Sequence, residues 1–121
     1  MAENYVSDKP YEPGTVMMFG GDAEVTESRG FLNPKVAGVV STNPAYLMNS
    51  TTDGVAIALK GRIPCKVEGP VNKGDLLVTG TTPGVATALA KDSAMPSSIC
   101  VIGKSIEANS DSGVKLVEIA V

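Results

Sequence analysis

VAIALKGRIPCKV, residues Val55–Val67, alternates in character with a period of two. Its odd positions are apolar or glycine, and its even positions include three cations, Lys60, Arg62 and Lys66. Successive side chains of a strand point to opposite faces, so the pattern predicts a strand with one buried face and one positively charged face in solvent. We expect Gly61 to mark a bulge or bend and Pro64 to lie at an edge or bend.

Turn signals divide the remaining chain into short segments at roughly ten-residue spacing. We expect loops at residues 22–35 and 93–98, and at 85–90 either a strand or one helical turn. Further strands are expected at Thr15–Phe19, Val36–Ser41, Leu76–Thr79, Ile99–Ile106 and Val114–Val121. The 13 glycines and 8 prolines favour turns over long helices. The sequence therefore predicts an all-β fold, a compact sandwich or small barrel of about seven or eight short strands.

The length of 121 residues fits a single compact domain. Pro10 and Pro13 resist regular structure near the start of the chain. We therefore expect an extended, weakly anchored N-terminal arm over residues 1–13 and one β domain over residues 14–121.

Charge and hydropathy exclude several partners. The net charge is −3 and lysine and arginine do not cluster, which disfavours nucleic-acid binding. No apolar run approaches the roughly 18 residues that a membrane helix requires. The first residues, MAENYVSDKP, lack the basic and apolar regions of a signal peptide, so we expect synthesis in a cytoplasm.

The residues do not favour catalysis. The chain contains no histidine, the commonest general base at neutral pH, which excludes Ser–His–Asp and Cys–His arrangements. The Gly20-Gly21 pair lacks the later glycines of a phosphate-binding loop. We therefore predict no enzyme activity, no catalytic residues and no cofactor.

The chain contains two groups of potential metal ligands. Asp22, Glu24 and Glu27 share one segment but lack calcium-loop spacing, so a solvated loop is favoured over a Ca²⁺ site. Cys65 and Cys100 lack metal-site spacing and are expected to be buried, reduced thiols, with a disulfide as the alternative if their strands are neighbours. No metal site is predicted.

Two further segments are candidates for a functional role. Met17, Met18 and Phe19 are expected to pack in the core or at a subunit interface, and the cations on the alternating strand are candidate contacts for an acidic neighbour. Asn49-Ser50 has the chemistry for histidine-independent self-cleavage, because the serine hydroxyl can attack the preceding carbonyl. An ordinary polar loop is the preferred interpretation of Asn49–Asp53.

Several short sequence motifs along the chain resemble those of a known family. They stand at Tyr11–Val16, Phe19–Asp22, Ala37–Ala45, Leu59–Val67, Val71–Thr79, Pro83–Ala86 and Val101–Glu107. In this order they resemble a β-rich domain near the C-terminus of tail-fibre and tailspike-like proteins of tailed bacteriophages, related to phage intramolecular-chaperone domains. The resemblance extends from about Tyr11 to Val121.

The resemblance implies a bacteriophage virion structural protein, a homotrimeric tail-fibre or tailspike-associated module that contacts other virion proteins and serves assembly or attachment. It implies a location in the virion after synthesis in the bacterial host. Asn43–Ala45 is similar to a segment of the self-cleaving chaperone group, so a trimerisation chaperone with cleavage at Asn49-Ser50 is one alternative. The other is a capsid-decoration protein on the phage head, whose N-terminal arm would suit strand addition to a neighbour.

Overall fold

The computed structural model describes residues 2–41, 47–48 and 54–121. This part of the chain contains eleven strands and one short 3₁₀ helix, η1. In chain order they are β1 (Ala2–Tyr5), β2 (Val16–Phe19), β3 (Val25–Glu27), β4 (Val36–Val39), β5 (Leu47–Met48), β6 (Val55–Ala58), β7 (Arg62–Glu68), β8 (Leu76–Thr79), β9 (Ala86–Ala88), η1 (Ser98–Cys100), β10 (Gly103–Ser105) and β11 (Val114–Ala120). The all-β prediction is confirmed.

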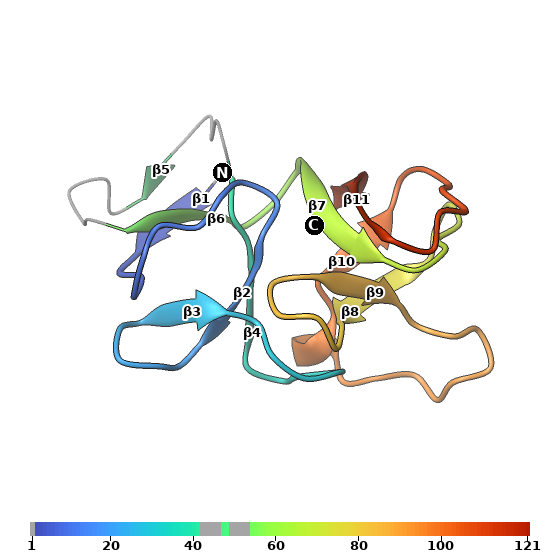
Figure 1. The fold of residues 1–121 in the computed structure, drawn as a ribbon, viewed down its shortest axis with the longest axis horizontal. Coiled ribbons are helices and arrows are strands. Elements are labelled where there is room, and N and C mark those ends of the chain that lie inside the picture. Colours follow the sequence, from blue (N-terminus) through green and yellow to red (C-terminus); the bar gives the residue numbers. More distant parts are fainter. Residues whose placement is uncertain (1, 42–46, 49–53) are drawn as a thin grey trace.

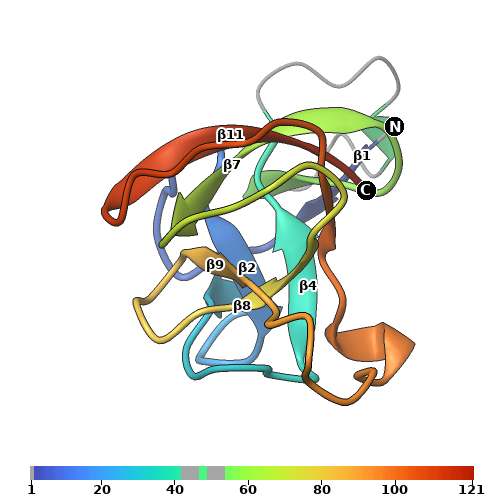
Figure 2. The ribbon, with the colours of Figure 1, turned by 90° about the vertical axis from the view of Figure 1, so that its right-hand side faces the viewer.

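The strands form one closed barrel and two three-stranded sheets (Figures 1 and 2). The barrel order is β10-β11-β7-β9-β8, and its longest ladder joins antiparallel β7 and β11 from Arg62↔Ala120 to Glu68↔Val114. The other sheets have the orders β3-β2-β4 and β5-β1-β6. Figure 1 shows β2 and β4 between the barrel and the β5-β1-β6 sheet.

The β3-β2-β4 sheet supplies residues to two separate hydrophobic cores. Val16 and Val39 belong to the barrel core, which also contains Ile63, Cys65, Val67, Leu77, Val117 and Ile119. Met17 and Val40 belong to a second core with Val25, Val55 and Ile57. Neighbouring residues on one strand point to opposite faces, so each face of this sheet covers a different core.

The prediction of one continuous strand over residues 55–67 is wrong, although its alternation holds. The segment forms two strands, β6 and β7, in different sheets. Gly61 adopts φ +121° in the connection and therefore marks the expected bend. Leu59, at an odd position where burial was expected, is 40% exposed because the connection carries it away from both cores.

Pro64 lies where β7 has a strand neighbour on one side only. It faces Glu118 of β11, whereas β9 pairs with β7 only at Val67 and Glu68. Proline lacks the N–H that a second neighbour would require, so its position agrees with the expected edge location.

The strand count exceeds the expected seven or eight. One additional strand, β3, lies within residues 22–35, expected to be a loop. The expected strand at residues 99–106 begins instead with η1 and contains only β10, whereas residues 85–90 contain the strand β9 rather than a helical turn. Strands of three residues make too few alternations to be recognised from the sequence.

The N-terminal segment is extended, but it is not loosely attached. All four residues of β1 pair with antiparallel β6, and Ala2 is fully buried. The Val6 carbonyl accepts hydrogen bonds from the backbone N–H groups of Glu24 and Val25. The expectation of weak anchoring is therefore wrong, because backbone pairing compensates for the polar sequence.

Within the described ranges, no helix has the length and apolar character to cross a membrane.

Candidate functional site

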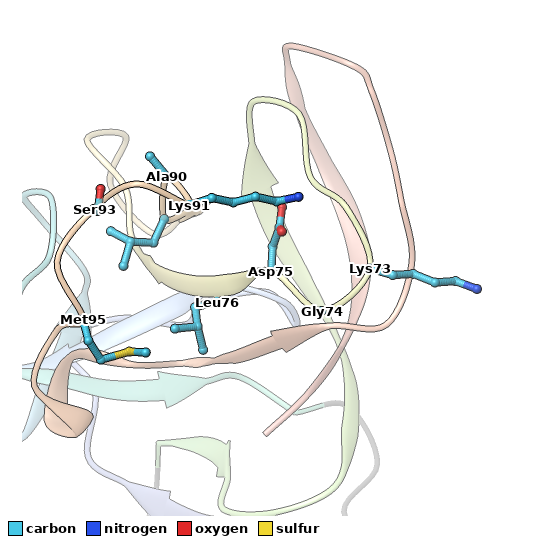
Figure 3. A pocket seen from close by; sticks show the side chains of 9 residues that line it. Lys73, Gly74, Asp75, Leu76, Ala90, Lys91, Ser93 and Met95 are labelled. Carbon is cyan, nitrogen blue, oxygen red and sulfur yellow. The ribbon is translucent and has the colours of Figure 1, made fainter.

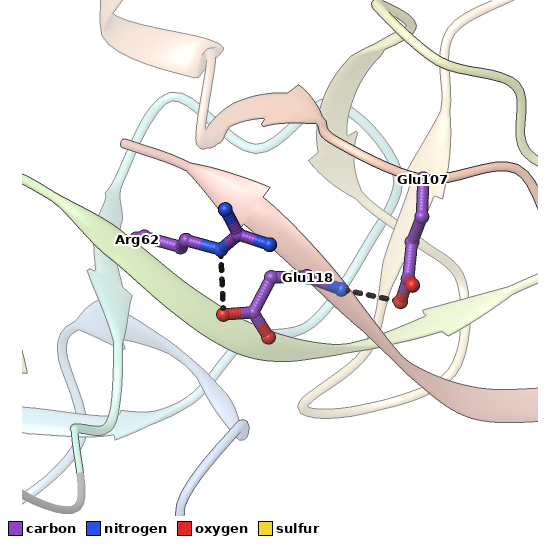
Figure 4. A network of polar contacts seen from close by, with 3 residues as sticks. All are labelled: Arg62, Glu107 and Glu118. Atoms are coloured by element: carbon purple, nitrogen blue, oxygen red, sulfur yellow. Dashed lines mark hydrogen bonds and ion pairs between the residues drawn. The ribbon is translucent and has the colours of Figure 1, made fainter.

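The expected basic face of the alternating segment is largely neutralised by acids from distant parts of the chain. Nε of Arg62 lies 3.2 Å from Oε1 of Glu118 on the adjacent strand β11. Figure 4 shows that the backbone N–H of Glu118 also donates a hydrogen bond, 2.8 Å long, to Glu107. Lys66 is ion-paired with Glu12 from the N-terminal segment. The structure therefore does not bring the predicted cations together as a uniform positive surface.

Lys60 differs from the other two cations. It lies in the exposed connection between β6 and β7, directly after Leu59. Within residues 2–41, 47–48 and 54–121 it makes no ion pair.

The three hydrophobic residues of β2 that were candidates for packing or an interface lie in different environments. Met17 is fully buried in the second core, and Met18 is half-buried. Phe19 is 44% exposed and packs edge-to-face against Tyr5 of β1, with 5.4 Å between the ring centroids. Only Phe19 presents a large apolar surface to solvent.

Glu3 and Glu24 lie near Tyr5 of this aromatic pair, and the backbone carbonyl of Lys35 accepts a 2.9 Å hydrogen bond from the Phe19 N–H. Burial raises the pKa of Tyr5, and the Glu3 and Glu24 carboxylates raise it further. Asp22 is exposed in the adjacent turn. We call this surface the acidic aromatic patch and define it by Tyr5, Phe19, Glu3, Asp22 and Glu24.

An apolar groove of about 250 Å³ lies elsewhere on the surface. Leu59 and Ile99 line it and are 40% and 62% exposed. Val36 of β4, Ala58 at the end of β6, Val101 after η1 and Val121 after β11 complete it. We call this surface the apolar groove. Every residue that lines it is apolar or glycine, and the exposed Leu59 and Ile99 side chains make it a candidate for contact with another protein.

No pattern in the sequence indicated this groove. Leu59 was expected to be buried, and Ile99 was expected in a strand. The four contributing segments are distant in sequence, and only their tertiary arrangement brings them together. One usable signal was Gly61, because a bend directly after Leu59 interrupts the buried face.

A second pocket, of about 310 Å³, is more polar (Figure 3). Lys73, Asp75, Lys91, Ser93 and Met95 line it, together with the half-buried Leu76. Asp75 accepts a 2.9 Å hydrogen bond from the backbone N–H of Asn72, so it stabilises the turn that precedes β8. Because the pocket is lined by both lysines and an aspartate, it has no clear preference for an anion or a cation.

The two cysteines are free thiols in buried positions. Burial raises the pKa of the Cys65 thiol to about 12. A thiol in this environment stays protonated at neutral pH and is a poor nucleophile and metal ligand.

No group of three or more potential metal-binding side chains is found in the part of the chain that the structure describes. Glu24 instead accepts a 2.7 Å hydrogen bond from the backbone N–H of Val6, and Glu27 lies within β3. The candidate cleavage bond Asn49-Ser50 lies outside the described residues.

Comparison of the sequence with protein-family models and with curated proteins finds no match.

Proposed function

We propose that this protein is a bacteriophage virion structural protein, a non-enzymatic, tail-fibre or tailspike-associated module that forms a homotrimer and serves assembly or attachment. The short sequence motifs between Tyr11 and Val121 support the phage assignment, because they resemble, in the same order, those of tail-fibre domains. The all-β fold agrees with the fold that this resemblance implies.

The observation that carries the structural role is the exposed apolar groove lined by Leu59 and Ile99. Exposed apolar surface is unfavourable in water unless a partner covers it, so it supports a role in protein assembly. The polar pocket does not favour a catalytic role. Its one hydroxyl side chain, Ser93, would need a base to act as a nucleophile, and the sequence has no histidine to provide one.

The capsid-decoration alternative relied partly on an N-terminal arm that could add as a strand to a neighbour. Residues 2–5 already pair with β6 along their whole length, so this support is weakened. The chaperone alternative depends on Asn49-Ser50, which the structure does not describe. The tail-associated role is therefore the function that we propose.

Quantitative mass spectrometry of purified phage particles tests this proposal. We expect the chain at a fixed copy number per particle, together with fibre or baseplate proteins in tail fractions. Enrichment in tail-free heads would instead support capsid decoration, and absence from particles would contradict both. An intact mass of 12.4 kDa for the purified chain would rule out self-cleavage, whereas two fragments would support the chaperone alternative.

A further inference from the structure

We propose that residues 29–35, which lie between β3 and β4, form a recognition loop that inserts Phe31 into an apolar pocket on an acidic partner protein. We call this segment the Phe31 loop. The inference rests on the proposed assembly role and identifies a surface of this chain that would carry it. It is supported by the exposure of the ring, by the fixed backbone around it and by two unpaired cations at the ends of the loop.

The chain has two phenylalanines, and neither is buried. Phe31 is 52% exposed, and its ring forms no aromatic pair with the residues that the structure describes. A single exposed apolar residue is common on protein surfaces. The backbone that carries Phe31 is what distinguishes it.

Thr79 fixes the residues on both sides of Phe31. It belongs to β8 and is fully buried. Its hydroxyl donates a 2.7 Å hydrogen bond to the Gly30 carbonyl and accepts one of 2.7 Å from the Asn33 backbone N–H. Its carbonyl accepts a third, 3.1 Å long, from the Leu32 N–H. The barrel therefore holds the backbone before and after Phe31 but leaves the ring exposed.

Leu32, directly after Phe31, adopts φ +56°, the only positive φ of a non-glycine residue in the described part of the chain. Leucine rarely adopts the left-handed region, and holding it there costs free energy that the surrounding contacts must offset. Strained residues of this kind are concentrated at functional sites. The strain therefore favours a functional role for the loop over an ordinary connection.

Two cations stand at the ends of the Phe31 loop. The Asn33 side chain holds their backbones together, because its amide nitrogen donates a 2.8 Å hydrogen bond to the Arg29 carbonyl and its oxygen accepts one of 2.9 Å from the Lys35 N–H. Both cationic residues are exposed, and neither forms an ion pair with any residue that the structure describes. The sequence contains no acid from residue 28 to residue 52.

These features define the chemistry of the partner. The Phe31 ring requires an apolar pocket, and the two cations favour carboxylates at the rim of that pocket. A fluid lipid surface would accept the ring in many orientations and would not require a fixed loop. The net charge of −3 and the presence of only two cations disfavour nucleic acid. The partner is therefore a protein and, within the proposed function, another protein of the virion.

Photo-cross-linking from position 31 tests the contact. In phage-producing cells, p-benzoylphenylalanine replaces Phe31 or, as the matched control, Met95, whose side chain is 80% exposed in a different loop. Cells and purified particles are irradiated, and the cross-linked peptides are identified by mass spectrometry. We expect position 31 to give one discrete product with another virion protein, at a peptide that contains aspartate or glutamate. Position 95 should not give this product.

Further variants separate recognition from folding. Arg29→Gln combined with Lys35→Gln should lower the cross-link yield about tenfold, because both charges that face the carboxylates are lost. Asn33→Ala should also lower it, since the loop ends are no longer tied. Phe31→Ala should leave the urea midpoint of the purified chain unchanged, because the ring is half-exposed. A clear fall in that midpoint would show that the ring supports the fold, and it would contradict the proposal.

Particles that contain the chain but give no product from position 31 would overturn the contact and leave the virion role intact. A product formed only with a second copy, with lipid or with nucleic acid would overturn the protein partner. If the chain is absent from particles, the irradiated cells still decide. A product at an acidic peptide that depends on Arg29 and Lys35 would then support the contact and refute the virion role, whereas no product would refute both.

Discussion

Gly38 of β4 packs directly against Ile57 of β6, at the contact between two of the three sheets. A β-carbon at position 38 would lie 2.7 Å from Cγ2 of Ile57, closer than carbon atoms approach. Gly38 also adopts φ +143°, which L-residues with a side chain rarely adopt. Close packing and backbone conformation therefore both require glycine at this position.

Gly38→Ala should destabilise the fold by about 1–3 kcal/mol, because the added methyl group must displace Ile57 and strain the backbone. Urea unfolding followed by circular dichroism measures the change. Gly113→Ala is the matched control: its β-carbon would have its nearest contact at 3.5 Å, so stability should change by less than about 0.5 kcal/mol. Equal losses in the two variants would contradict the proposed packing requirement.

Met17→Ala should cost about 2–5 kcal/mol of unfolding free energy, because it leaves a cavity in the second core. Phe19→Ala, two residues along the same strand, should cost less, since its ring is already 44% exposed. Chemical denaturation of both variants as monomers provides the comparison. A larger loss for Phe19→Ala would show that its ring serves the core rather than an interface.

Alkaline pH should destabilise the protein partly through Cys65. Burial raises the pKa of its thiol from 9.0 to about 12, so the folded state resists ionisation that the unfolded state allows. This stabilisation is complete below pH 9 and is lost as pH rises from there through 12, at up to about 1.4 kcal/mol per pH unit. Unfolding free energies of the unaltered chain and Cys65→Ala at several alkaline pH values test this, and the variant should show the shallower decline. Parallel declines would contradict it.

Glu68 should stabilise the loop after β8 most strongly when ionised. Burial acts to raise its pKa, but hydrogen bonds from Thr82 and Thr81 outweigh burial and hold the pKa below its ordinary value. Its Oε1 accepts the Thr81 backbone N–H at 3.0 Å. The resulting stability is present above the ordinary pKa of 4.5 and is lost as pH falls through the folded-state value.

Glu68→Gln should therefore lower stability by about 1 kcal/mol at neutral pH and reduce the loss of stability on acidification. Denaturation at neutral and acidic pH measures both effects. Asp92→Asn, which removes an exposed acid in the loop before η1, should leave both quantities unchanged. A Glu68→Gln variant with unaltered acid sensitivity would show that this carboxylate does not support the loop.

The sequence predicted the fold class and most of the strands for a clear physical reason. Burial on one face imposes a period of two, and Val55, Ile57, Ile63, Cys65 and Val67 are all buried as the alternation indicated. The alternation could not show that this segment contributes to two cores, because the buried residues have odd numbers both before and after the bend at Gly61.

The sequence predicted less of the candidate surfaces than of the fold. The pairing of Lys66 with Glu12 depends on where the N-terminal segment returns to β7, and the groove depends on Ile99 reaching the neighbourhood of Leu59. Long-range packing of this kind leaves no local period in the sequence. The exposure of Phe19 beside Tyr5 and nearby glutamates likewise depends on the pairing of β1 with its neighbours, which no local pattern in the sequence indicates.

The virion role is tested most directly by locating the protein on whole phage particles by electron microscopy with a gold-labelled antibody. The account predicts label on the tail, at the fibres or the baseplate, in every intact particle. Label on the head would identify a capsid-decoration protein instead. Particles without any label, from a preparation in which the antibody recognises the purified native chain, would contradict the virion role.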